Sequence, residues 1–245
     1  KHNALGLKHV RRTSIGADVV RAGRKLHRAE AESLMRQIAA DPNVEFVEPN
    51  ARMTAFFTPD DTRFGEQWGY TASGINATQA WDVSTGTGVV VAVIDTGIVS
   101  HSDLNANIIG GYDFISDATA ARDSNGRDSN PADQGDWVAA ADCGLGYASN
   151  SSWHGTHVAG TIAAVTNNAK GVSGTAYNAK VVPVRVLGKC GGTLADIADA
   201  ITWASGGTVS GVPANPNPAE VINMSLGGSG TCGSSYQTAV DGGVS

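Results

Sequence analysis

The sequence has no long hydrophobic run and no metal-binding pair of cysteines. No apolar stretch among the 245 residues approaches the roughly 20 residues of a membrane-spanning helix, so we expect no membrane partner. The three cysteines, Cys143, Cys190 and Cys232, form no C-x-x-C pair. Three cysteines permit three different single disulfides, or three separate buried thiols, and their spacing does not choose among these arrangements.

Two further motifs are missing. The chain begins at Lys1 without the basic, apolar and small-residue segments of a signal peptide, so we expect a processed or trimmed N-terminus. His154 and His157 lie three positions apart with no glutamate between them, unlike the H-E-x-x-H motif of zinc proteases. A zinc enzyme is therefore disfavoured.

Charge is unevenly distributed along the chain. Residues 1–52 carry ten Lys and Arg against six Asp and Glu, whereas residues 53–245 carry seven against seventeen. A net charge of +4 beside one of −10 indicates electrostatic complementarity between two parts of one protein. The basic side chains alternate with acidic and apolar residues instead of forming a continuous patch, so we expect no nucleic-acid partner.

Residues 1–52 have the pattern of a small α+β unit. A helix is predicted over Glu30–Ala40, ended by Asp41-Pro42-Asn43, and an edge strand over Val44–Glu48. Residues 53–64 are interpreted as a linker. The predicted domains are therefore residues 1–52 and residues 53–245.

From about Gly74 onward, strand and helix patterns alternate. This alternation predicts an α/β fold with a doubly wound, mainly parallel sheet. Residues 111–152 form a long acidic stretch without periodicity, which is typical of a functional or metal-bound loop. The strands are expected over Val89–Ile94, Ala179–Leu187 and Glu220–Leu226, and the helices over Trp153–Val165 and Leu194–Ser205.

Two motifs place a carboxylate and an imidazole where a catalytic pair is needed. Asp95 ends the apolar strand VVVAVID, and His154 begins the helix in HGTHVAGT. A serine nucleophile requires a nearby base, and the base requires a carboxylate that orients it. Alone, each residue is a common structural one, a strand-end aspartate or a buried histidine. Together they predict two members of an Asp-His-Ser triad.

These segments resemble the subtilisin family of serine proteases. VAVIDTG, HGTHVAGT and VINMSLG are similar to three family signatures in the family's order, and the likeness extends from about Thr58 to Ser245. Residues 1–52 resemble the C-terminal part of an inhibitory prodomain with a ferredoxin-like fold, closing with Phe46-Val47-Glu48-Pro49-Asn50. The acidic loop together with Lys189-Cys190-Gly191-Gly192 resembles the secreted bacterial enzymes of the Xanthomonas and Dichelobacter type.

The resemblance implies that Asp95 orients the base and that His154 is the general base. It also implies a nucleophilic serine in a Gly-Thr-Ser turn and an oxyanion-hole asparagine, and neither motif occurs in these 245 residues. Ser225 follows Met224 in a predicted strand and is not in that setting. We therefore expect the chain to be an incomplete part of a protease.

The resemblance also implies a substrate cleft between two glycine-containing segments. Its walls would be Ser225, Leu226 and Gly227 on one side and Gly191 and Gly192 on the other, where an extended peptide could add as a strand. Ordinary turn glycines are the alternative interpretation. In the resembling subgroup Cys143 pairs with Cys190, and Cys232 pairs with a later cysteine.

Calcium is the cofactor that the resemblance implies, with oxygen ligands in a surface loop. A second site is predicted in the acidic loop, for which a solvated surface is the alternative. The ligands of the first site would be Asp61, Asp103, the Asn168 side chain and the carbonyls of Lys170 and Val172. Those of the second would come from Asp117, Asp123, Asn125, Asp128 and Asp133.

The sequence thus predicts a secreted, extracellular bacterial serine endopeptidase in zymogen form. Its expected partners are protein or peptide substrates and its own prodomain as an intramolecular inhibitor, and we expect a monomer. Two alternatives remain open at this point: a non-catalytic peptide-binding pseudoprotease, and a metal-dependent hydrolase that uses His154 and His157.

Overall fold

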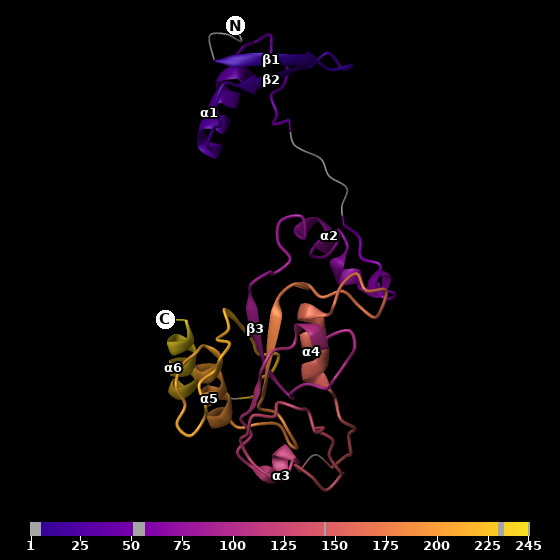
Figure 1. Ribbon diagram of the computed structural model, residues 1–245, viewed down its shortest axis with the longest axis vertical. Helices are drawn as coiled ribbons and strands as arrows, with labels where there is room; N and C mark the ends of the chain where they lie inside the picture. The colour runs from indigo at the N-terminus through magenta and orange to yellow at the C-terminus, as the bar shows by residue number, and fades with distance from the viewer. Residues whose placement is uncertain (1–5, 51–56, 145, 230–232, 245) are drawn as a thin grey trace. The chain divides into compact units, whose positions relative to one another are not determined.

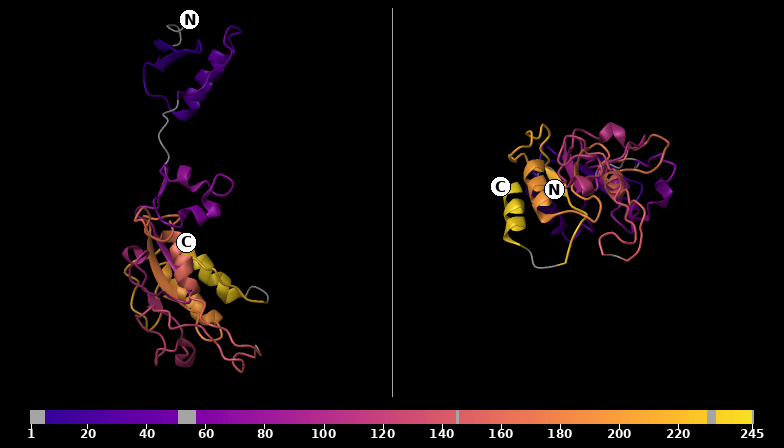
Figure 2. Two further views of the ribbon diagram at one scale, coloured as in Figure 1. Left: turned by 90° about the vertical axis from the view of Figure 1, so that its right-hand side faces the viewer. Right: turned by 90° about the horizontal axis from the view of Figure 1, so that it is seen from below.

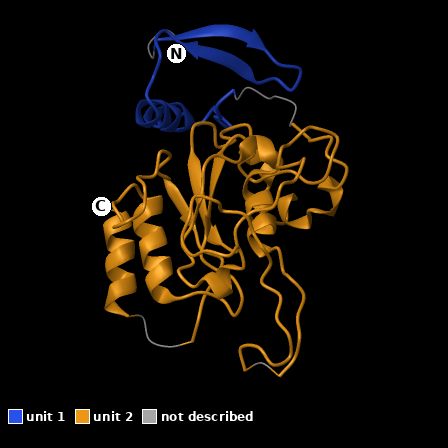
Figure 3. Ribbon diagram, turned by 60° about the horizontal axis from the view of Figure 1, so that its bottom comes forward, with its two compact units in different colours: residues 1–55 blue, residues 56–245 orange. Residues whose placement is uncertain are grey.

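The computed structural model describes residues 6–50, 57–144, 146–229 and 233–244 (Figure 1). The chain divides into two compact units, residues 1–55 and 56–245 (Figure 3). The predicted boundary between residues 52 and 53 falls within 51–56, outside the described residues, as does Cys232. The prodomain and peptidase roles of the two units stay predictions.

Over residues 6–50, the described part of the first unit, the chain forms a β-hairpin and one helix. Strands β1 (Leu7–Arg12) and β2 (Asp18–Ala22) pair antiparallel around a turn in which Gly16 has a φ of +86°. Helix α1 (Arg28–Ala39) forms where a helix is predicted. Its first turn is held by the Glu30 carboxylate, which accepts a hydrogen bond from the backbone N–H of His27 at 3.0 Å.

The edge strand predicted over Val44–Glu48 is wrong. The stretch is irregular in the described structure, and Phe46 is half exposed. Alternation of side chains identifies a chain that could pair, but a strand also needs a partner with free backbone groups. Within residues 6–50 the structure pairs only β1 with β2. The ferredoxin-like fold of this unit therefore stays a prediction.

The second unit is built on a four-stranded parallel sheet, which confirms the predicted α/β fold. The strand order is β4-β5-β3-β6, so β3 lies between β5 and β6. The observed strands are shorter than the predicted ones. Their bounds are β3 (Val90–Asp95), β4 (Tyr112–Asp113), β5 (Lys180–Arg185) and β6 (Val221–Asn223).

Helices cover both faces of this sheet (Figures 1 and 2). Alternate residues of β3 and β5 point to opposite faces, and each set enters a different apolar cluster. Ile94 and Val184 pack with Ile201 and Trp203 of α5, whereas Val93 and Val181 pack with Ala159 and Ala163 of α4. Helix α6 packs beside α5. The bounds are α4 (His154–Ala163), α5 (Leu194–Ala204) and α6 (Ser234–Gly243).

Pro183 lies inside β5, an interior strand, although proline cannot donate to a sheet. The backbone N–H groups of Lys180 and Val186 donate to β3 and the residue before it. Because alternate residues of a parallel strand bond to the same neighbour, residue 183 faces β4 instead. On that side Gly110 and Gly111, with φ values of +57° and +121°, interrupt the pairing. The missing N–H of Pro183 therefore leaves no ladder bond broken.

The first described residues of the second unit are packed into that unit instead of forming a linker. Phe57 and Phe64, from the described part of the predicted linker 53–64, have ring centroids 6.2 and 6.1 Å from that of Trp81. Tyr70 and Tyr177 complete this aromatic cluster. The short helix α2 (Ala77–Ala80) and 3₁₀ turns over Phe64–Glu66, Trp68–Tyr70 and Asn105–Asn107 form the surrounding segments.

The described residues of the acidic stretch 111–152 are mostly irregular, with β4 at the start and a short helix, α3 (Ala118–Ala121). A disulfide joins Cys143 to Cys190, which confirms the implied pairing and ties the stretch to the segment after β5. Beside it, Lys189 pairs with Asp142 at 2.7 Å. A long irregular stretch is thereby fixed to the sheet at its far end.

A buried arginine fixes the same stretch near its start. The Arg185 side chain is fully buried and donates to the carboxylates of Asp113 and Asp123 and to the carbonyl of Ala121. Burial raises the pKa of Asp113 to about 6, while the attraction of Arg185 lowers it. The pair is thus costly to bury and depends on both partners.

Replacing Arg185 by methionine is therefore expected to lower the free energy of unfolding by roughly 3–5 kcal/mol, because two buried carboxylates lose their cation. Urea denaturation of the protein measures the change. Arg63→Met is the control, since Arg63 and Glu66 form a surface pair with 64% exposed side chains, and it should cost less than about 1 kcal/mol. Equal losses in the two variants would contradict the anchoring role of Arg185.

Candidate active site

Asp95 and His154 meet at the carboxyl end of β3. Asp95 is the last residue of that strand and fully buried, and His154 is the first residue of α4. The His154 Nδ1 atom lies 2.9 Å from each Asp95 carboxylate oxygen. The imidazole is 45% exposed, whereas the carboxylate is 0% exposed. A buried acceptor thus holds one ring nitrogen of a histidine that solvent can reach.

Two glycines allow the strand end and the helix start to approach this closely. A Cβ atom on Gly155 would lie 2.4 Å from the Gly97 carbonyl oxygen and 3.2 Å from the Asp95 Cβ. Gly97 has a φ of +98°, and a Cβ there would lie 2.5 Å from the Pro131 carbonyl oxygen. Glycine at both positions is therefore a steric requirement of the Asp95–His154 contact.

Thr96 connects the strand end to the helix start. Its hydroxyl accepts a hydrogen bond from the Gly155 N–H at 3.0 Å and donates one to the Asp133 carboxylate at 2.7 Å. Burial raises the pKa of Asp133, and its hydrogen bonds from Thr96 and Gly135 oppose the rise. Reasoning from sequence did not find the role of Thr96, although its position directly after Asp95 is the signal that could have identified it.

The predicted cleft segments lie on opposite sides of β3. Ser225, Leu226 and Gly227 follow β6, and Gly191 and Gly192 follow β5, which are the two neighbours of β3 in the sheet. Both segments leave the sheet at the carboxyl ends of their strands, the edge at which Asp95 lies. This topology is the one that a cleft across the site requires.

The local geometry differs between the two segments. The Ser225 hydroxyl donates to the Asn223 side chain at 2.9 Å, so it is engaged away from His154. Gly191 has a φ of +90° in a tight turn closed on Gly188. A Cβ on Gly192 would lie 2.2 Å from the Val186 carbonyl, so this glycine has a local packing reason. A role in binding stays a prediction for all five residues.

The first predicted calcium site is a loop folded around two buried carboxylates. Asp61 accepts hydrogen bonds from the backbone of Asn167 and Asn168 and from the Ser173 hydroxyl. Asp103 accepts from the Asn168 side chain at 2.7 Å and from the Val172 N–H at 3.1 Å.

These two carboxylates are 5% and 3% exposed. In the described part of the chain, neither forms an ion pair with lysine or arginine. Buried carboxylates without a cationic partner are costly, and the donor set of carboxylates, one amide and loop carbonyls is the set that calcium prefers. The residue types of this loop are therefore ones that calcium takes as ligands, and a calcium site here stays a prediction.

The second predicted site stays a prediction, and its carboxylates have other partners in the described structure. Among the residues that the structure describes, no three His, Cys, Asp or Glu side chains gather in a group suited to a metal ion, in this loop or in the first one. The carboxylates have separate tasks: Asp123 pairs with Arg185, Asp128 accepts from Asn125 and Asn130, and Asp133 accepts from Thr96 and Gly135. Asp117 caps α3.

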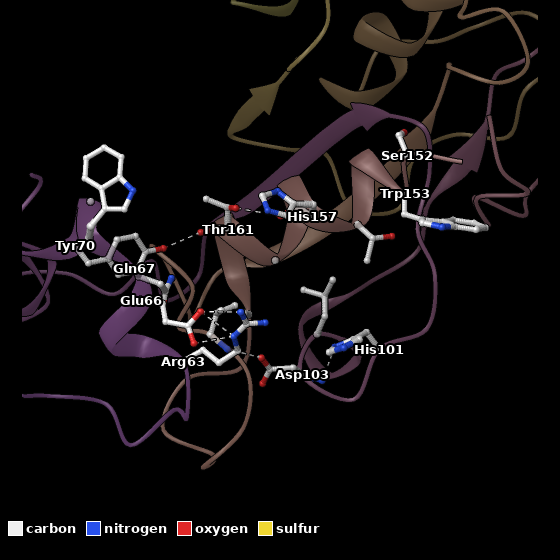
Figure 4. Close-up of a pocket in the computed structure, with 17 residues that line it drawn as sticks. Arg63, Glu66, Gln67, Tyr70, His101, Asp103, Ser152, Trp153, His157 and Thr161 are labelled. Carbon is white, nitrogen blue, oxygen red and sulfur yellow. Dashed lines mark hydrogen bonds and ion pairs between the residues drawn. The ribbon is translucent and has the colours of Figure 1, made fainter. Parts of the chain in front are cut away.

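A pocket of about 950 Å³ lies along α4 (Figure 4). His157 and Thr161 of α4 line it together with Trp153, and the Arg63–Glu66 pair lies at another part of its wall. Neither Asp95 nor His154 lines it. The reactive atoms of the site are therefore outside this pocket.

No helix in the described ranges is both long enough and apolar enough to cross a bilayer. The model of the subtilase family, a peptidase family, matches residues 86–244, which include both catalytic candidates.

Named relatives agree with this match. The chain is 69% identical over 245 residues to an extracellular protease of Xanthomonas campestris pv. campestris, covering 99% of this chain and 42% of that protein. It is 51% identical over 240 residues to an extracellular basic protease of Dichelobacter nodosus, covering 95% of this chain and 40% of that protein. The chain thus spans about two fifths of the length of these curated relatives.

A solved structure described as proteases from Pseudoalteromonas arctica PAMC 21717 has 64% sequence identity and a TM-score of 0.75. The alignment covers 76% of this chain and 56% of that one. The sequence match, the shared fold and the order of strand-end aspartate and helix-start histidine agree. The chain belongs to the subtilase family.

Proposed function

We propose that this chain supplies the aspartate and the histidine of a serine endopeptidase that hydrolyses peptide bonds. The observation that carries the proposal is the contact of the His154 Nδ1 with both oxygens of the buried Asp95, at 2.9 Å each. This contact selects the tautomer with a proton on Nδ1 and leaves Nε2 as the base. The serine and the oxyanion-hole asparagine would come from the full-length protein.

In this reaction His154 accepts the proton of the serine hydroxyl while the serine oxygen attacks the substrate carbonyl carbon. The resulting imidazolium is stabilised by the negative charge of Asp95, whose complete burial strengthens that attraction. His154 then returns the proton to the leaving amine, and a water molecule releases the acyl group by the same steps. The imidazole is half exposed, so both the serine hydroxyl and the leaving amine can reach it.

Substrate is proposed to bind as an extended strand between the two glycine-containing segments. Gly191 and Gly227 are exposed, and a Cβ atom on either would meet no atom within 4 Å among the described residues beyond its chain neighbours, so an added strand could approach both positions. The N–H and carbonyl of Gly191 are bonded to Gly188, so a substrate strand would have to replace those bonds there. Main-chain hydrogen bonds to an added strand give affinity without fixing the side chains. Ser225, Leu226 and Gly192 would complete the two walls.

We further propose that the protein is a secreted zymogen and that residues 1–52 inhibit it. The Xanthomonas and Dichelobacter relatives are named extracellular proteases, and a disulfide such as Cys143–Cys190 persists in oxidising surroundings. The basic first segment and the acidic remainder have complementary charge. We propose that the active form is a monomer.

Calcium is proposed as a structural cofactor at the first loop. Asp61, Asp103 and Asn168 would hold it through side-chain oxygens, and Lys170 and Val172 through their carbonyls. The cation would neutralise two buried carboxylates and fix the loop 167–173.

Replacing His154 by alanine in the full-length protein is expected to abolish peptide hydrolysis and leave the fold intact. Loss of the base in subtilisin, a well-studied member of this family, reduces kcat by about 10⁶-fold, and we expect a loss of that order. Hydrolysis of a chromogenic peptide measures the rate, and circular dichroism verifies folding. His157→Ala, three residues later on the same helix, should retain near-normal turnover. An active His154→Ala enzyme would contradict the proposed base.

Adding calcium is expected to raise the melting temperature, because only the folded loop presents the ligands together. At about 100 times its Kd, calcium adds about 2.7 kcal/mol to the free energy of unfolding. Differential scanning fluorimetry across a calcium titration measures the effect. Asp61→Asn and Asp103→Asn should abolish it, whereas Asp128→Asn in the acidic loop should retain it. A response lost only in Asp128→Asn would place the cation in the acidic loop instead.

A further inference from the structure

Two hydroxyl groups bind consecutive backbone N–H groups at the start of α4. The N–H of His154 donates to the Ser152 hydroxyl at 3.3 Å, and that of Gly155 donates to the Thr96 hydroxyl at 3.0 Å. Trp153, the residue before the helix, provides no side-chain cap. The first turn of the helix that carries the proposed base is therefore held from outside.

Each hydroxyl in turn donates to an aspartate of the acidic loop. Thr96 donates to Asp133 at 2.7 Å, and Ser152 donates to Asp136 at 2.8 Å. Two parallel chains of hydrogen bonds thus run from the helix to residues that lie three positions apart in the sequence.

The direction of both chains is fixed by the carboxylates. Asp133 accepts from the Gly135 N–H with its other oxygen, and Asp136 accepts from the Ser152 N–H with its other oxygen. An ionised carboxylate accepts hydrogen bonds and donates none. Each hydroxyl must therefore donate its single proton to the loop, which leaves its lone pairs for the helix N–H groups.

The segment around Asp133 is fixed to the residues that follow β3. Asp133 donates its N–H to the Ile98 carbonyl at 2.9 Å, and Ile98 donates to the Pro131 carbonyl at 3.0 Å. A Cβ on Gly135 would lie 2.4 Å from the Ser151 hydroxyl oxygen, so glycine is required for this close approach. Asp133 is therefore held by the segment that directly follows Asp95, and Asp136 lies three residues further along the loop.

We propose that Asp133 and Asp136 are positioning residues for the catalytic histidine. Through Thr96 and Ser152 they fix the first turn of α4, so that the imidazole of His154 presents Nδ1 to Asp95. Their two negative charges also interact favourably with the positive end of the helix dipole at its N-terminus. This role rests on the proposed function, because positioning matters only if His154 is the base.

The test replaces each aspartate by asparagine in this protein and measures two properties of the histidine by NMR. Each aspartate accepts two hydrogen bonds, one with each oxygen. Asparagine has almost the same shape but can accept with one atom only, because its NH2 group donates. Each variant therefore loses one of the two hydrogen bonds. The exchange rates of the backbone amides report the helix start. The low-field resonance of the His154 Nδ1 proton reports its bond to Asp95.

We expect the Gly155 amide in Asp133→Asn and the His154 amide in Asp136→Asn to exchange about fivefold faster or more, as loss of one hydrogen bond implies. In the double variant the Nδ1 resonance should broaden or disappear. Asp142→Asn is the matched control, because it removes the same charge from the same loop where the partner is Lys189, and both readouts should stay unchanged.

An unchanged Nδ1 resonance and unchanged exchange in the double variant would overturn the inference while the Asp95–His154 pair stands. A wild-type protein without that resonance would overturn the pair and the inference together. Should the double variant fail to fold, Thr96→Val and Thr96→Ser decide the question. The inference is supported if the Gly155 amide exchanges faster in Thr96→Val and at the wild-type rate in Thr96→Ser. Equal exchange rates in the two variants contradict it.

Discussion

The close approach of one helix start to one strand end is the constraint on which the site depends. Asp95 and His154 are 59 positions apart in the sequence, and they meet because no side chain separates Gly97 from Gly155. The parallel sheet supplies the rest of the geometry. It places the end of β3 between the ends of β5 and β6, so the segments proposed to bind substrate lie on opposite sides of the Asp95–His154 pair.

The acidic loop supports this arrangement. It is held to the sheet by the buried Arg185 near its start and by the Cys143–Cys190 disulfide near its end. Between these anchors Asp133 and Asp136 reach the first turn of α4 through two hydroxyls. Its charge is therefore used in specific hydrogen bonds and ion pairs, and a long irregular segment is kept where the proposed chemistry needs it.

The sequence predicts those parts of the molecule that local pattern determines. The strand before Asp95 and the helix that begins at His154 both form as predicted. Each is marked by a pattern within its own residues, a continuous β-branched run for the buried strand and helical periodicity for the helix. The strand expected over Val44–Glu48 does not form, because pairing depends on a distant partner. The carboxylates at 123, 128 and 133 resemble a ligand set in the sequence, yet Asp123 and Asp133 have partners that only the fold brings near, and Asp128 is bonded locally by Asn125. The bond from Thr96 to Asp133 likewise joins residues that are distant in the sequence.

The most direct test of the account is alkylation of the full-length protein with a peptidyl chloromethyl ketone, a reagent that binds as substrate and alkylates the catalytic imidazole. Peptide mapping by mass spectrometry locates the adduct. The account predicts one adduct, on His154, and none after Asp95→Asn, because the imidazole then loses the carboxylate that orients it. Alkylation of His157 or His101 at a comparable rate, or no dependence on Asp95, would contradict the claim that Asp95 and His154 form the catalytic pair.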